Sequence, residues 1–322
     1  MVKYSKPLAG SRGFWPKKRA KRIFPRVRFS QKYPKAVPVA FAAYKAGMVS
    51  VSYMDPRKES ATKGQEIVEA ATVLEAPPLK VIGIKLYRLA YSALIDSGTV
   101  WAEGLPKDLS RAMSIPKNPR AKERLEKFSK LEGIHDLRIL ACTQPKDAGF
   151  KKAPEVFELP VGGDLKAKWE YAKQKLGREI SAKEIFEESE PVDVIAVTKG
   201  KGYQGPVKRF GVKIRPRKSE GKRRHVGSLG PWHPARVLPG KIAMAGQLGF
   251  QTRTEHNKKI VRIGSDGLAV AGGMLHYGQV KGDYMLVLGS VPGSRKRLVF
   301  LRKPVRNYSR PVKIEVKKVF SD

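Results

Sequence analysis

The sequence contains a single cysteine, Cys142, among 322 residues. One cysteine excludes an internal disulfide framework and any metal site built from several cysteines, and it suits a reducing, intracellular setting. No apolar run approaches the roughly 20 residues that span a bilayer. The N-terminus also has no apolar core of the signal-peptide kind. We therefore expect a mature, cytoplasmic protein with no membrane partner.

Acidic residues are missing from a long first part of the chain. Residues 1–54 contain thirteen Lys or Arg and no acid, and Asp55 is the first. The whole chain has a formal net charge of +36, which would strongly repel itself in a compact isolated protein. A bound polyanion resolves that repulsion, and this balance favours nucleic acid over a membrane surface. The 41% hydrophobic content is still enough for a folded core.

Catalytic and metal-binding patterns are weak. Residues 200–205 match G-x-G-x-x-G after a predicted strand, which is the pattern of a dinucleotide-binding turn. However, Pro206 follows at once, no crossover helix is predicted, and no acid stands about 20 residues further on. The five histidines show no ligand spacing, and His233 lacks a nucleophile and an orienting partner. We expect no catalytic residue, metal or cofactor; an RNA-modifying or nucleotide-binding enzyme remains the alternative.

Short strands punctuated by Gly and Pro predict a small β-barrel or sandwich. The predicted strands are 41–53, 63–75, 79–89, 191–199, 258–264, 267–273, 283–291 and 295–302. Residues 103–190 differ, because sixteen acids nearly balance eighteen Lys or Arg there. Helical periodicity at 119–131 and 164–176, with a capping box at Ser181 and Glu184, predicts a mostly helical insertion. Such a charge-balanced insertion should face solvent or protein rather than phosphate.

Two basic segments flank this folded part. Residues 1–35 interleave aromatic residues with Lys and Arg and have a proline about every nine residues, which predicts an extended arm that orders on a partner. Residues 227–253 are rich in Gly and Pro, contain no acid and show no periodicity, so they predict a long functional loop. Residues 208–224 contain nine Lys or Arg against one acid, Glu220. Such a cluster favours phosphate contacts over a solvated face.

The type of nucleic acid is less clear from charge alone. No helix-turn-helix, zinc finger or basic zipper is visible, and irregular arms with Gly and aromatic residues suit structured RNA. Trp232 either contacts RNA or packs on its own loop. A basic DNA-compacting protein is a third hypothesis, which equal affinity for duplex DNA and structured RNA would support.

Several loop motifs resemble one family. Gly227-Ser228-Leu229-Gly230, Pro239-Gly240-Lys241, Met244-Ala245-Gly246-Gln247-x-Gly249 and Val291-Pro292-Gly293 have the order and spacing of the universal large-subunit ribosomal protein three family. The segment PWHPARV and residues 254–264 resemble its archaeal and eukaryotic branch. The chain lacks the long C-terminal extension of many eukaryotic members, so the archaeal type is more similar. The resemblance covers essentially the whole chain.

This resemblance implies a mainly β fold, a translation-protein-type six-stranded β-barrel with an α/β insertion and long basic extensions. Members are not enzymes; they bind large-subunit ribosomal RNA near its 3′ end early in assembly and touch neighbouring ribosomal proteins. A finger loop would reach toward the peptidyl-transferase centre with Trp232 at its tip. The implied division is a basic extension (1–35), barrel (36–96), mostly helical insertion (97–191), barrel strand (192–204), finger (205–259), and barrel with basic tail (260–322).

The residues expected to contact RNA combine the basic clusters with the loop motif. They are Lys17, Lys18, Arg19, Lys21, Arg22, Lys208, Arg209, Lys213, Arg215, Arg217, Lys218, Lys222, Arg223, Arg224, Trp232, His233, Arg236, Lys241, Gln247 and Arg253. We further expect residues 1–35 and about 210–255 to be largely disordered in the absence of RNA.

Overall fold

The protein, seen here in a computed structural model, forms two compact units. Unit 1 comprises residues 1–23 and 197–253, and unit 2 comprises residues 24–196 and 254–322. The structure describes residues 14–29, 31, 33–57, 59–129, 131, 133–238, 240–306 and 314–320. Predictions for residues 1–13 of the arm and for 307–313 of the tail therefore lie outside the described residues. Within the described part, no helix has the length and apolar character that crossing a membrane requires.

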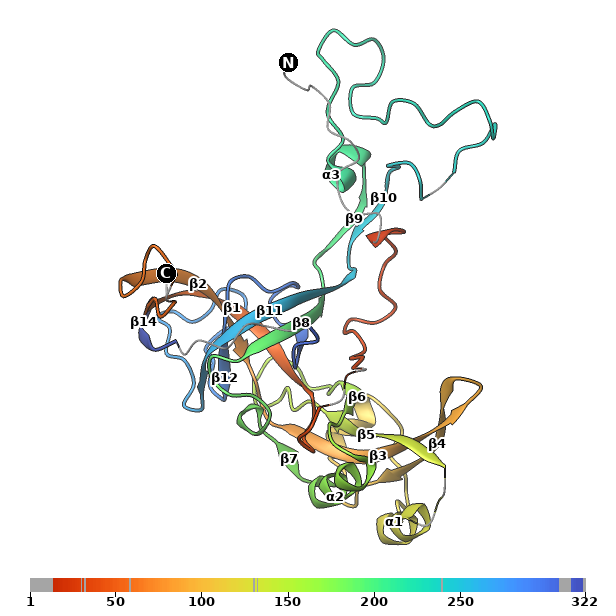
Figure 1. The fold of residues 1–322 in the computed structure, drawn as a ribbon, viewed down its shortest axis with the longest axis vertical. Helices are drawn as coiled ribbons and strands as arrows, with labels where there is room; N and C mark the ends of the chain where they lie inside the picture. The colour runs from red at the N-terminus through yellow and green to blue at the C-terminus, as the bar shows by residue number, and fades with distance from the viewer. Residues whose placement is uncertain are drawn as a thin grey trace. The chain divides into compact units, whose positions relative to one another are not determined.

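Strands dominate the secondary structure, as predicted (Figure 1). The strands are β1 (Ala40–Met54), β2 (Glu66–Glu75), β3 (Leu79–Ala90), β4 (Ala93–Trp101), β5 (Ile134–Cys142), β6 (Val156–Pro160), β7 (Glu179–Ile180), β8 (Pro191–Val197), β9 (Gly200–Gln204), β10 (Gly246–Gly249), β11 (Thr252–Gly264), β12 (Tyr284–Leu288), β13 (Leu298–Arg302) and β14 (Val316–Phe320). The helices are α1 (Ala121–Ser129), α2 (Leu165–Lys175), α3 (Pro206–Phe210) and the 3₁₀ helices η2 (Lys107–Arg111) and η3 (Ala182–Glu184).

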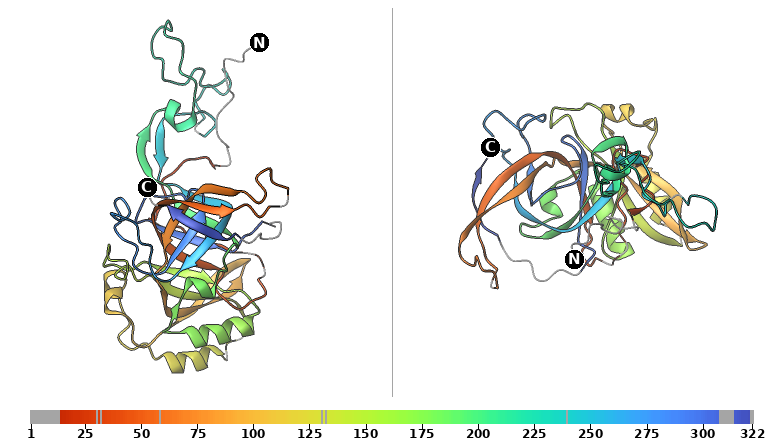
Figure 2. Two further views of the ribbon diagram at one scale, coloured as in Figure 1. Left: turned by 90° about the vertical axis from the view of Figure 1, so that its left-hand side faces the viewer. Right: turned by 90° about the horizontal axis from the view of Figure 1, so that it is seen from above.

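A seven-stranded sheet has the order β13-β8-β11-β12-β2-β1-β14. Strand β1 also pairs antiparallel with β13, with Phe41 opposite Leu301, so the first and sixth strands of this order are hydrogen-bonded to each other. Figure 2 shows these strands curving strongly. Valine, aromatic and other apolar residues in β1 suit a strand that is buried over most of its length.

A second sheet of unit 2 has the order β4-β3-β5-β6, with the short β7 paired to β3. Leu86 and Leu137 face each other in register across β3 and β5 and are completely buried. They belong to one apolar core that also includes Ala172 of α2 and Phe300 of β13, so this core is shared by both sheets. Burying this apolar surface is the main favourable term holding unit 2 together.

Phe24 and Val27 of the basic arm also belong to this core. The ring of Phe24 lies 6.3 Å from that of Phe157, which in turn lies 4.8 Å from Phe300 in an edge-to-face arrangement. Val27 is only 7% exposed. Aromatic pairs in this geometry add to the stabilisation from burial. The second half of the predicted arm therefore packs on unit 2 instead of extending freely.

The prediction of a mostly helical insertion at 97–191 was wrong in its secondary structure. That range contains β5, β6, β7 and the end of β4 besides α1 and α2. Ile134–Cys142 alternates apolar and polar residues only over a short length, so its strand signal is weak. The prediction for the whole range followed the more regular helical periodicity of α2 instead. The prediction of a strand at 267–273 was also wrong, because only Leu268 forms an isolated bridge there and Gly267, Gly272 and Gly273 have positive φ.

The sequence signals for the two ends of α2 and for the start of the next helix predicted the structure better. The helix begins after Asp164, although the Asp164 side chain makes no capping hydrogen bond. Gly177 follows it with φ +77° and donates its N–H to the Val81 carbonyl at 3.1 Å. The capping box at Ser181 and Glu184 is present and begins η3, which is shorter than the helix predicted to Glu188.

Candidate nucleic-acid interface

The candidate interface begins at a short hairpin in unit 1. Strands β9 and β10 pair antiparallel, with Gln247 opposite Tyr203 and Gly249 opposite Gly200. Gly249 has φ +73°, and a Cβ there would lie 2.0 Å from the Lys199 carbonyl oxygen, so no other residue fits without moving the backbone. The hairpin brings together the two ends of a loop that comprises residues 205–245.

Arg209 of α3 holds the returning end of this loop. Its Nε donates to the Gln247 carbonyl at 3.0 Å, and its Nη1 donates to the Met244 carbonyl at 2.7 Å. A Cβ on Gly246 would lie 3.0 Å from the guanidinium group, so glycine allows this close approach. Partial burial lowers the pKa of Arg209. Arg209 was predicted to bind RNA, yet two of its donors are already used inside the protein.

The first half of the basic arm packs on the same helix. The rings of Trp15 and Phe210 lie 4.6 Å apart, and Lys17 Nζ lies 4.4 Å from the centre of the Phe210 ring. The same amine donates to the Arg209 carbonyl at 2.9 Å. These contacts combine apolar packing with a cation–π interaction. Residues of the arm and of the loop base therefore form one surface within unit 1.

Three cations gather at this surface. Burial lowers the pKa of Lys17, and the positive charges of Arg209 and Arg253 lower it further. Burial also lowers the pKa of Arg253, whose guanidinium lies 4.7 Å from the centre of the Phe14 ring. The sequence of unit 1 contains 22 Lys or Arg and a single acid, Glu220. A polyanion would relieve the mutual repulsion of these cations.

The twenty residues predicted to contact RNA fall into two classes. Five are half-buried or make internal contacts at the loop base, namely Lys17, Arg209, Arg215, Gln247 and Arg253. The other fifteen are exposed, namely Lys18, Arg19, Lys21, Arg22, Lys208, Lys213, Arg217, Lys218, Lys222, Arg223, Arg224, Trp232, His233, Arg236 and Lys241. The Trp232 side chain is 83% exposed, so the alternative that it packs on its own loop was wrong.

Part of the basic loop folds back on itself. The Arg215 N–H donates to the Arg223 carbonyl at 3.1 Å, and Arg223 Nε donates back to the Arg215 carbonyl at 3.4 Å. Ile214 and residues 221–225 line an open recess of about 610 Å³ beside this pair. Arginine and lysine around an open recess suit phosphate groups, which they contact through charge-assisted hydrogen bonds.

The G-x-G-x-x-G pattern lies in a strand and not in a phosphate-binding turn. Gly200 to Gln204 form β9, and the following helix α3 has only five residues. Within β9, Tyr203 is 77% exposed, and sequence reasoning missed it as a candidate contact. An aromatic residue between glycines in a basic segment is the signal that could have found it, since exposed rings can stack on bases.

The described residues include few side chains suited to metal binding or nucleophilic chemistry. Among the described residues, no three His, Cys, Asp or Glu side chains come together as metal ligands would. Cys142 is buried in unit 2, and burial raises the pKa of its thiol to about 11. This thiol therefore stays protonated at neutral pH and is a poor nucleophile.

Comparison with known proteins gives the family. The family model for ribosomal protein L3 matches residues 1–322. The chain belongs to the ribosomal protein L3 family. Large ribosomal subunit protein uL3 of Archaeoglobus fulgidus is 43% identical, covering 95% of this chain and 93% of the relative. The proteins of the same name from Nanoarchaeum equitans and Methanosphaera stadtmanae are each 44% identical, over 96% and 97% of this chain and 94% and 95% of the relatives.

The motifs that resembled this family have defined places in the L3 chain. Gly246, Gln247 and Gly249 form β10 beside Arg209. Val291 and Gly293 lie in unit 2, where their carbonyl groups accept hydrogen bonds from Lys45 Nζ at 2.5 and 3.5 Å. One motif therefore shapes the loop base, and the other fixes the turn between β12 and β13 to β1.

Proposed function

We propose that this chain is a structural constituent of the large ribosomal subunit in the cytoplasm, that it binds large-subunit ribosomal RNA near the 3′ end of that RNA, and that it supports early assembly. The names of its relatives support its place in the large subunit, and the positive charge of unit 1 supports RNA binding. Its 22 Lys or Arg against one acid are the observation on which the proposal depends. Each neutralised phosphate releases counterions, so such a surface binds RNA tightly and in a salt-dependent way.

We also propose that the finger expected at residues 205–259, whose loop comprises residues 205–245, extends toward the peptidyl-transferase centre. The exposed ring of Trp232 supports a tip that contacts RNA. The hairpin of β9 and β10, clamped by Arg209, supports a fixed base from which such a finger projects. Lys and Arg along the loop would neutralise phosphate, so that RNA helices can pack closely around it.

The six strands β13, β8, β11, β12, β2 and β1 are proposed to form the translation-protein-type barrel. Their hydrogen-bonded order and the additional pairing of β1 with β13 support closure. Barrel closure removes the unpaired strand edges that would otherwise invite aggregation. In this proposal, β8 and β11 lead from the barrel to the finger, and the charge-balanced second sheet meets neighbouring ribosomal proteins.

Binding affinities for one RNA and one DNA ligand, measured over a series of salt concentrations, test the proposed function. The ligands are a transcript of the large-subunit RNA 3′ region and duplex DNA of equal length. We expect tighter binding to the transcript, persisting at salt concentrations that release the duplex. Equal and equally salt-dependent affinities would contradict specific RNA recognition and would support the DNA-compacting alternative.

A charge variant makes this test specific to unit 1. Replacing Lys218, Lys222 and Arg224 by Gln should reduce the slope of log affinity against log salt by about 2 to 3. The matched control replaces three exposed cations of unit 2 by Gln, namely Lys117, Lys122 and Lys127. We expect the control to leave the slope unchanged. A control that lowers the slope as much as the unit 1 variant would contradict the assignment of RNA binding to unit 1.

A further inference from the structure

The hairpin of β3 and β4 ends in an unusual tip, defined here as residues 89–95. Ala90 pairs with Ala93, so Tyr91 and Ser92 alone form the loop. Both have positive φ, +48° and +62°, as a two-residue type I′ turn requires. Such turns strongly prefer Asn-Gly, and a bulky residue at positive φ is strained. The strain at Tyr91 indicates that its ring is required there for a reason other than hairpin stability.

The tip exposes a cluster of apolar side chains. Leu89, Tyr91, Leu94 and Ile95 are 53%, 102%, 39% and 41% exposed. Leu89 and Leu94 pair on one face of the hairpin. Ile95 lies opposite Arg88 on the other face, and Tyr91 stands in the turn between the strands. Single exposed apolar residues are ordinary, but several gathered at one hairpin tip are typical of an interaction site. Tyrosine is also enriched among the residues that contribute most to protein–protein affinity.

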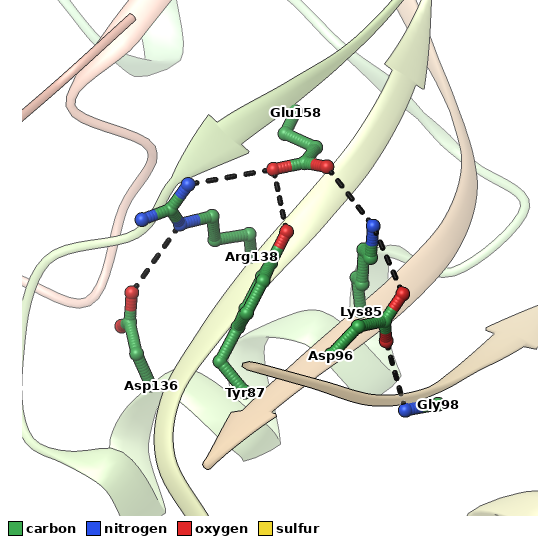
Figure 3. A network of polar contacts seen from close by, with 7 residues as sticks. All are labelled: Lys85, Tyr87, Asp96, Gly98, Asp136, Arg138 and Glu158. Carbon is green, nitrogen blue, oxygen red and sulfur yellow. Dashed lines mark hydrogen bonds and ion pairs between the residues drawn. The ribbon is translucent and has the colours of Figure 1, made fainter. Parts of the chain in front are cut away.

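The charges around the tip favour a protein partner over RNA. The tip itself has no charged residue. Below it, Lys85 Nζ lies 3.1 Å from an Asp96 carboxylate oxygen and 3.2 Å from one of Glu158, and Arg138 Nη1 lies 3.4 Å from Glu158 (Figure 3). These cations are therefore already neutralised by carboxylates. Arg88 is exposed beside the tip and would suit an acidic residue on the partner.

The edge of the sheet offers a second means of contact. Strand β4 is the terminal strand of its sheet, and no described strand pairs with its outer edge. The Thr99 carbonyl accepts a hydrogen bond from Arg124 Nη1 at 3.2 Å, which covers the far end of the strand. The end of β4 near the tip thus presents backbone groups to which an extended partner segment can add.

We propose that this tip docks on a neighbouring protein of the large ribosomal subunit, at an apolar recess that receives Tyr91 and has an acidic side chain facing Arg88. The inference rests on the proposed function, because it takes the partner from the same subunit. It assigns a specific contact to the second sheet of unit 2.

Photo-crosslinking within purified large subunits tests the docking. The probe is p-benzoylphenylalanine at position 91, and the control is the same probe at Val68, which is 60% exposed on β2. We expect position 91 to crosslink one defined subunit protein at an apolar site, and the control not to crosslink that protein. Crosslinks from position 91 to RNA, or to no partner, would overturn this inference alone. Absence of the chain from large subunits would overturn the proposed function as well.

A double variant separates the ring from the fold of the hairpin. Tyr91→Asn with Ser92→Gly supplies the preferred type I′ sequence, so we expect an unchanged or higher melting temperature. With the photo-crosslinker moved to Leu94, the same variant should lower the crosslinking yield to the partner protein about tenfold. An undiminished yield at an unchanged melting temperature would overturn the role of Tyr91 as the anchor.

Discussion

The two units carry positive charge in opposite ways. Unit 1 has 22 Lys or Arg against one acid in 80 residues, whereas unit 2 has 43 against 28 in 242 residues. Every ion pair found among the described residues joins two groups of unit 2, such as Lys303 and Glu190 at 2.7 Å. In unit 1, cations instead contact carbonyl groups and aromatic rings, as Lys17 and Arg209 do. Charge serves internal structure in unit 2, whereas unit 1 has a single acid with which its cations could pair, which fits the proposed binding of RNA.

The two units also differ in how many apolar residues they bury. Unit 2 contains the shared core of both sheets, and unit 1 has few buried apolar residues, among them Phe210 and Ala243. A region with little apolar burial gains little free energy from folding on its own. This difference supports the expectation that the finger orders fully on RNA, which stays a prediction. Strong amide-exchange protection of residues 210–255 in the free protein would contradict it.

The largest expected effect comes from the core of unit 2. Phe300 is completely buried and packs edge-to-face on Phe157 at 4.8 Å. Phe300→Ala should lower the free energy of unfolding by about 3–5 kcal/mol. Trp232→Ala, in the exposed part of unit 1, should change it by less than about 0.5 kcal/mol. Urea unfolding followed by circular dichroism measures both, and similar losses for the two variants would remove the contrast between the units.

A buried carboxylate in unit 2 gives the second prediction. The Asp193 side chain accepts hydrogen bonds from Arg302 Nη2 at 2.7 Å and from the Asn257 and Val305 N–H groups at 3.2 and 3.3 Å. His256 Nδ1 lies 3.0 Å away. Burial opposes ionisation, but the hydrogen bonds from Arg302 and the Asn257 N–H, together with the nearby His256 ring, outweigh it and lower the pKa of Asp193. The carboxylate joins residues of β8, β11 and β13.

The sign of the pH dependence follows from the lowered pKa. The stabilisation by Asp193 is present above its unfolded value of 3.8 and is lost as the pH falls through the lower folded value. Asp193→Asn should therefore cost about 3 kcal/mol at pH 7, because it leaves Arg302 without its buried partner. The difference from wild type should shrink below about pH 4. The exposed control Glu170→Gln should show neither effect, and a pH-independent cost for Asp193→Asn would contradict this account.

The sequence predicted β1 and α2 of unit 2 better than β9 and β10 of unit 1 for a physical reason. β1 is long and rich in apolar and aromatic residues, and α2 with its C-cap places Trp169, Ala172 and Leu176 against the core at helical spacing, so both elements are visible in the sequence. β9 and β10 have only five and four residues, many of them glycine, and their hydrogen bonds leave no such pattern. Residues 267–273 show the opposite error, since apolar residues suggested a strand where three glycines have positive φ and no strand forms.

The positive charge of the candidate interface was predictable from the sequence, but the division of its cations into half-buried and exposed residues was not. Lys218, Lys222 and Trp232, which the basic cluster and the loop motif indicated as RNA contacts, are exposed, and their contact with RNA stays a prediction. Composition could not separate them from Arg209, because an arginine that contacts carbonyl groups and one that meets phosphate are the same in sequence. Only the return of the chain at β10 brings the Met244 and Gln247 carbonyls within reach of Arg209. That return depends on contacts between residues far apart in the chain.

The smallest expected effect tests this division within unit 1. Arg209 uses two different nitrogens for two carbonyl groups, whereas Arg217 is exposed. Lysine keeps the charge but cannot reproduce the fork of the guanidinium group. Arg209→Lys should therefore lose about 1 kcal/mol of stability at the loop base and weaken binding to the 3′-region transcript about fivefold. Arg217→Lys should stay within about twofold of wild type, since a point charge also neutralises phosphate. If both variants weaken binding equally, Arg209 acts through its charge alone, and the distinction between half-buried and exposed cations in unit 1 has no functional meaning.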